Sequence, residues 1–116
     1  MKRIYILGLL SVILFTACSK TDYFPPADNV NDWMRTHEKG IVAYVDYYTG
    51  NYIVETYNGF SVIEYWNGPT PGKYDEEYAY FNRMGVQTIY NWRGDYFTQG
   101  RVADYWLTWP DALYVL

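Results

Sequence analysis

The chain offers few side chains that could carry out catalysis. His37 is its only histidine, and Cys18 is its only cysteine. Any charge-relay arrangement of a nucleophile with histidine would therefore depend on His37, which lies near Glu38 in a short predicted helix. The sequence contains no zinc-type spacing of cysteine and histidine, no phosphate-binding glycine loop and no dinucleotide fingerprint. We therefore expect His37 to be a surface or capping residue, and we expect neither a cofactor nor a metal.

Carboxylates are the other groups that could do chemistry. Glu55 and Glu64 lie on neighbouring predicted strands, where a pair of carboxylates could act in glycoside hydrolysis. Asp75, Glu76 and Glu77 could offer oxygens to Ca²⁺, but the alternating acidic spacing with glycine of a calcium loop is missing. We expect this acidic trio to form a solvated turn, and we keep a hydrolase that uses these carboxylates as an alternative function.

Aromatic residues are unusually frequent, with 15 tyrosines and 5 tryptophans in 116 residues. Most should pack in the core or across strands, but a small domain cannot bury them all, and exposed aromatic patches commonly mark binding sites. Five of them flank the longest predicted loop: Trp66, Tyr74, Tyr78, Tyr80 and Trp92. They are the candidate platform for a sugar ring or an extended peptide. The alternative is that the two tryptophans belong to the core.

The elements that would position these residues are mainly strands. Six runs rich in valine, isoleucine and tyrosine end in glycine or asparagine turns and predict strands at 41–48, 52–57, 60–66, 78–81, 86–92 and 96–106. Asn58-Gly59 predicts a type I′ hairpin turn. Arg93-Gly94-Asp95 matches a tripeptide of cell-adhesion ligands, but its place between two strands favours an ordinary turn. Gly100, inside the last run, predicts a bulge or a bend.

Two short helices are expected at the ends of the strand region. Val30, Trp33 and Met34 recur at helical spacing after Asn29, and Gly40 would end this first helix. Near the end of the sequence, Thr108 precedes Pro110 and Asp111, which is the pattern of a capped helix start.

Short strands joined by tight turns must curl or close to cover their edges. We therefore predict a mainly β fold, a small curved antiparallel barrel of five to six strands with one or two short helices. Its three-stranded meander, longer excursion and final hairpin are similar to OB-type barrels, and an SH3-like barrel fits the strand count as well. A two-sheet sandwich is the alternative.

The first residues have the layout of a secretory signal. Lys2 and Arg3 precede an uncharged stretch, and small residues lead to Cys18. The 15 residues from Ile4 to Cys18 would form a helix roughly 22 Å long, shorter than a hydrocarbon core of about 30 Å. We therefore expect a cleaved signal and not a transmembrane helix.

Phe15-Thr16-Ala17-Cys18 resembles the lipobox of bacterial lipoproteins, although leucine is usual where Phe15 stands. The resemblance implies a signal peptide at 1–17, acylation of Cys18, a lipidated tether at 18–28 and a single domain at 29–116. Two or three acyl chains would hold the chain on a membrane without crossing it. In Gram-negative lipoproteins, a residue such as Ser19 after the cysteine favours the outer membrane.

The charge balance limits the partners. Removal of the signal leaves seven basic against thirteen acidic residues, a net charge of −6. Nucleic acid is therefore an unsuitable partner, since phosphate binding needs a basic patch. We expect a non-catalytic binding or assembly module of the cell envelope, tethered to the membrane through Cys18, with an envelope protein, peptide or glycan as ligand. A hydrolase of envelope polymers, a structural spacer and an inhibitor are the alternatives.

Overall fold

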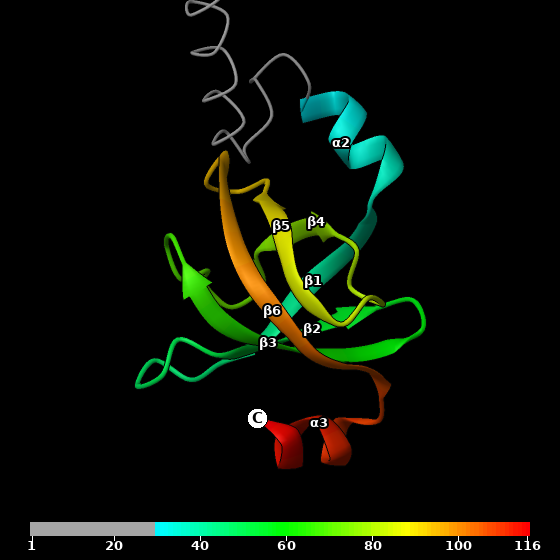
Figure 1. The fold of residues 1–116 in the computed structure, drawn as a ribbon, viewed down its shortest axis with the longest axis vertical. Coiled ribbons are helices and arrows are strands. Elements are labelled where there is room, and N and C mark those ends of the chain that lie inside the picture. Colours follow the sequence, from blue (N-terminus) through cyan, green and yellow to red (C-terminus); the bar gives the residue numbers. More distant parts are fainter. Residues whose placement is uncertain (1–29) are drawn as a thin grey trace, which may run out of the picture.

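The chain folds into a closed antiparallel β-barrel with a short helix on either side (Figure 1). The computed structural model describes residues 30–116, so the predicted signal, Cys18 and the tether lie outside the described residues. The elements are α2 (Val30–Thr36), β1 (Glu38–Val45), β2 (Tyr52–Thr56), β3 (Gly59–Asn67), β4 (Glu76–Ala79), β5 (Gly85–Asn91), β6 (Tyr96–Leu107) and α3 (Trp109–Val115). No helix in this part of the chain is long and apolar enough to cross a membrane.

The six strands close the barrel in the order β1-β2-β3-β6-β5-β4, with β4 paired to β1. Two three-stranded meanders therefore join edge to edge, and every neighbouring pair is antiparallel. The predicted small curved barrel is confirmed, and the two-sheet sandwich is wrong. Closure leaves no free strand edge among the described residues, which removes the edges that promote aggregation in open sheets.

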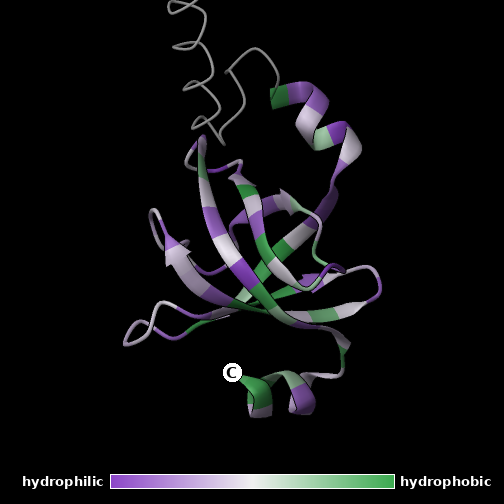
Figure 2. Ribbon diagram, in the orientation of Figure 1, coloured by the Kyte–Doolittle hydropathy of each residue, from purple (hydrophilic) through white to green (hydrophobic). Residues whose placement is uncertain are grey.

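The barrel interior is filled by alternate residues of each strand, as the pleat requires. Its fully buried members include Val42, Val54, Ile63, Phe81, Ile89 and Val102. Figure 2 shows polar and apolar segments alternating along the strands. Gly100 lies on this inner face, where a Cβ atom would come within 2.5 Å of Ile63 Cγ2. The register of β3 against β6 shifts beside it, but the extra residue is Trp66 of β3, so the irregularity lies opposite Gly100 and not at Gly100 itself.

A second, smaller hydrophobic cluster lies between the outer face of the barrel and α3. Ile53 and Val62 point outward from β2 and β3 and are covered by Ala112 of α3. Thr108 caps the helix, because its hydroxyl accepts a hydrogen bond from the Asp111 amide, as the sequence predicts. Since Ala112 is the only fully buried residue of α3, the helix lies close to the barrel through a small side chain.

The first helix is shorter than predicted. α2 ends at Thr36, so Gly40 does not terminate it and instead belongs to β1. A Cβ atom at Gly40 would lie 2.2 Å from Val54 Cγ1, so the glycine allows close approach inside the barrel. The glycine was wrongly interpreted as a helix stop because close packing inside a barrel also selects for a missing side chain.

The hairpin at Asn58-Gly59 is present, but its predicted type is wrong. Thr56 pairs with Gly59, so the two loop residues are Tyr57 and Asn58. A type I′ turn requires positive φ at both of them. Neither residue has it, and Gly59, with φ of 133°, is the residue with positive φ instead.

Candidate functional site

The five predicted platform residues fall into two groups. Tyr78 and Tyr80 are half-buried on the side of the barrel that α2 covers. The indole Nε1 of Trp33 donates a hydrogen bond of 2.9 Å to the Tyr78 carbonyl oxygen. The ring of Tyr80 lies 4.2 Å from the imidazole of His37 and 3.8 Å from the guanidinium of Arg83. These two tyrosines therefore hold α2 on the barrel.

His37 has a structural role in the same contact. Its ring stacks on Trp33 at 3.7 Å, and its Nδ1 donates to the Trp33 carbonyl oxygen at 2.8 Å. Burial lowers the pKa of His37, and the hydrogen bond to the carbonyl works in the opposite direction. The imidazole thus closes the last turn of α2, which is the capping role expected from the sequence.

Trp66, Tyr74 and Trp92 are exposed, with 53%, 71% and 54% of their surface accessible. Tyr74 and Trp92 both lie near the start of β4. The Tyr74 amide donates a hydrogen bond to the Val42 carbonyl oxygen, and the Trp92 amide donates one to the Glu76 carbonyl oxygen. Trp66 is separate, because it lies on β3 beside Gln99 of β6. Along β6, Gln99 is three residues, or roughly 10 Å, from Tyr96, which pairs with the end of β5. The backbones of Tyr74, two residues before Glu76, and of Trp92, bonded to Glu76, thus lie near the start of β4, whereas Trp66 lies on β3.

The acidic trio is not a solvated turn. Glu77 is fully buried inside the barrel and Asp75 is nearly so. The Asn91 amide Nδ2 donates to both carboxylates at 3.0 Å, and the Tyr52 hydroxyl donates to Glu77 Oε1 at 2.8 Å. The prediction failed because β4 closes the barrel against β1 and turns alternate residues of this acidic segment inward.

Burial has a large effect on Glu77. Desolvation raises its pKa to about 7, the hydrogen bonds from Tyr52 and Asn91 act to lower it, and the charge of Asp75 raises it. Tyr96, on β6, also has its pKa raised, to about 12, by burial and by these two carboxylates. Asp75 and Glu77 therefore form a buried polar pair within the barrel. Arg93 lies beside this pair, with its Nε 3.8 Å from Asp75 Oδ1.

Arg93 belongs to the turn between β5 and β6 that contains the Arg-Gly-Asp sequence. The Gly94 amide donates to Asn91 Oδ1 at 2.8 Å, and the Tyr90 hydroxyl donates to Asp95 Oδ1. The expectation of a turn at this tripeptide is confirmed.

Glu55 and Glu64 are not brought together. Glu55 pairs with Phe60, and Glu64 lies four residues further along β3, roughly 13 Å away. The Glu64 carboxylate accepts a hydrogen bond of 2.8 Å from Arg101 Nε. No pocket is found in the surface of the described residues.

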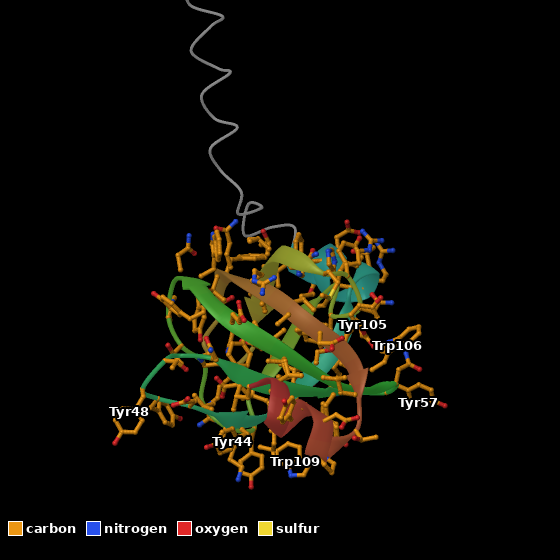
Figure 3. The ribbon with its side chains drawn as sticks, turned by 60° about the horizontal axis from the view of Figure 1, so that its bottom comes forward. Tyr44, Tyr48, Tyr57, Tyr105, Trp106 and Trp109 are labelled. Atoms are coloured by element: carbon orange, nitrogen blue, oxygen red, sulfur yellow. The ribbon has the colours of Figure 1, made fainter. Side chains whose placement is uncertain are left out.

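An exposed apolar surface surrounds α3, and we call it the α3 face. Its members are Tyr44, Trp109, Leu113, Tyr114 and Val115, and Tyr114 is 90% exposed. Tyr44 pairs across the β1–β2 ladder with Ile53, which α3 covers, and Trp109 contacts Phe60 edge-to-face at 5.1 Å. Figure 3 shows Tyr44 and Trp109 beside the helix. Figure 2 shows the end of this helix as strongly hydrophobic.

A second exposed aromatic group lies where the β2–β3 hairpin meets the end of β6. Tyr57 is almost fully exposed, and Trp106 is more than half exposed (Figure 3). Trp106 has a φ of 58°, which is unusual for a bulky residue. Tyr105 meets it edge-to-face at 5.4 Å. This group extends the aromatic surface beyond α3.

Sequence reasoning missed the α3 face because it weighted aromatics beside the longest loop. The available signal was the helix itself, whose seven residues include Trp109, Leu113, Tyr114 and Val115. A helix this apolar cannot turn all of these side chains to the barrel, because only one face of it packs. A scan against family models gives no match for the chain, and searches of curated proteins and of solved structures give none either.

Proposed function

We propose that this chain is a lipid-anchored, non-catalytic binding module of a bacterial cell envelope. The N-terminal sequence, with its signal layout and Cys18, supports the anchor, and Ser19 favours the outer membrane of a Gram-negative cell. The observation that carries the binding role is the α3 face, where large apolar side chains remain in water on a domain that already has a closed core.

The size of this surface favours a binding role. A fully exposed tyrosine or tryptophan presents on the order of 200 Å², so the α3 face amounts to on the order of 400–500 Å² of apolar side chain. The largest apolar patch on a typical monomer is about 300–600 Å² and is often functional, so the α3 face lies within this range. A protein interface contributes about 800 Å² per partner, a little over half of it apolar. The α3 face therefore matches one side of an ordinary protein interface.

Tyr74 and Trp92 remain the candidates for a second platform, which would stack on a glycan or an extended peptide, and Trp66 lies outside it. The two surfaces can be told apart by position. A photoreactive amino acid is introduced into the full chain, in the bacterium that makes it, at Tyr114, at Tyr74 or at Thr70 as an exposed control. We expect discrete cross-linked adducts from position 114 and none from position 70.

Adducts from position 74 alone would transfer the binding role to the loop platform. No adducts from either aromatic position, with a folded and membrane-bound chain, would refute the binding proposal.

The anchor has its own test: Cys18→Ser should abolish labelling by radioactive palmitate and release the chain from the membrane fraction. A Cys18→Ser chain that still takes up palmitate would contradict the proposed anchor.

A further inference from the structure

We propose that the α3 face docks a basic polypeptide segment, one that presents arginine or lysine beside aliphatic or aromatic side chains. This inference rests on the proposed binding function and adds the chemical class of the partner. It depends on where the charges of the domain lie.

The α3 face is built by a part of the chain that has no cations. No lysine, arginine or histidine occurs in residues 41–63 and 102–116. These residues form β1 from its centre, β2, most of β3, the end of β6 and α3. All lysines and arginines of residues 30–116 lie within 35–39 and 73–101. Positive charge therefore lies on α2, at the start of β1, in the loops at 73, 83 and 93, and at Arg101 of β6, whose guanidinium pairs with Glu64.

Acidic side chains border the α3 face. Glu55 pairs with Phe60 and Asp104 with Val62, and both partners belong to the cluster under α3. Asp111 lies in the first turn of α3 itself. The four ion pairs found among residues 30–116 involve other carboxylates, so these three carry negative charge without a cation beside them.

An apolar centre with an acidic border attracts a complementary surface. A partner that carries lysine or arginine is steered toward it, and a second acidic surface is repelled. Guanidinium and ammonium groups also bind over exposed tyrosine and tryptophan rings. Self-association through this face would bring the acidic borders of two copies together, and an anionic lipid surface would be repelled by the same border. A basic polypeptide is the occupant that both features favour.

The test is a selection from a displayed random-peptide library with the full chain in detergent. Peptides that also bind the double variant Leu113→Ser, Tyr114→Ser are removed first, so that only peptides dependent on the α3 face remain. Both side chains are exposed, and thermal unfolding of the variant checks that it folds. We expect the remaining peptides to be enriched in arginine and lysine and depleted in aspartate and glutamate.

The charged border is tested with one recovered peptide. The triple variant Glu55→Gln, Asp104→Asn, Asp111→Asn should weaken its binding about fivefold at low ionic strength, since each rim charge contributes modestly. The loss should shrink to less than about twofold at 1 M salt, where the Debye length is about 3 Å. Asp32→Asn, an exposed carboxylate on α2, is the matched control and should leave binding unchanged.

The outcomes separate the two proposals. Peptides that depend on the α3 face but show no basic enrichment would overturn the partner class and leave the binding function standing. The absence of any peptide dependent on this face would overturn both. Sedimentation that shows a dimer lost in the double variant, or binding to phosphatidylglycerol vesicles lost in it, would overturn the partner class in favour of a second copy or a lipid surface.

Discussion

Replacement of Glu77 by glutamine should change how the stability of the barrel depends on pH. Glu77 is fully buried, and its pKa is raised to about 7 from an ordinary value of 4.5, first by burial and then by the charge of Asp75. Glutamine has nearly the same shape. Its carbonyl oxygen can accept from Asn91 and its amide can donate to the Tyr52 hydroxyl, so the variant resembles the protonated carboxyl.

The direction of this pH dependence follows from the difference between the pKa of Glu77 in the folded and in the unfolded chain. In the unfolded chain Glu77 ionises at an ordinary pKa, whereas in the barrel it keeps its proton up to about pH 7. The contribution of Glu77 to the stability of the wild type is therefore fully present below about pH 4.5 and is lost as the pH rises through about 7. A difference of 2.5 pKa units at 1.36 kcal/mol each gives about 3 kcal/mol. That is a large share of the 5–15 kcal/mol typical of folded proteins.

The measurement is urea unfolding of wild type and Glu77→Gln, followed by tryptophan fluorescence between pH 4.5 and pH 8.5. The two proteins should have similar unfolding free energies at pH 4.5, and the variant should be more stable by about 3 kcal/mol at pH 8.5. The comparison removes the contributions of Glu38, whose pKa burial also raises, and of His37, whose pKa burial lowers.

Glu55→Gln is the matched control, because this glutamate is exposed on β2. Its unfolding free energies should run parallel to those of the wild type. The reasoning about Glu77 would be refuted if Glu77→Gln also ran parallel to the wild type across this range. A variant less stable than the wild type at pH 8.5 would refute it as well.

Three further substitutions test other parts of the structure. Gly100→Ala should lower the unfolding free energy by about 1–3 kcal/mol, because its methyl group would overlap Ile63, and a thermal shift above the wild type would contradict this. Thr108→Ala should cost about 0.5–1 kcal/mol in urea unfolding through the lost cap, and no measurable loss would show that the cap does not contribute. Tyr52→Phe removes a hydrogen bond that lowers the pKa of Glu77, so the Glu77 pKa measured by NMR titration should rise, and a fall would contradict the assignment.

Strand positions and fold class were predictable because they depend on local patterns. Each strand in the structure overlaps a run of valine, isoleucine and tyrosine that ends at a turn residue, and closure into a barrel follows from the need to cover strand edges. The cap at Thr108 is equally local. Gly40 was misinterpreted because its function, close approach to Val54, depends on a strand more than ten residues away.

The buried carboxylates show where local reasoning fails. Three consecutive acidic residues resemble a solvated turn, and only the pairing of β4 with β1 makes this segment a strand of the barrel. The sequence does contain a usable signal. Ala79 and Phe81 mark the inner face of this segment, and a period of two carried back from them reaches Glu77 and Asp75. Had alternation been weighed above charge, the buried pair would have been expected.

The way α3 is attached to the barrel supports the proposed binding role of its exposed side chains. The cluster under the helix is closed by Ala112 and the half-buried Leu116. Leu113 and Val115 are partly buried, with 44% and 37% of their surface exposed, and a rotation of the helix that buried them further would lift Ala112 off Ile53. A helix selected only to cover the barrel would carry polar residues at these outward positions, as surface helices ordinarily do. These exposed apolar residues are the observation on which the proposed binding function rests.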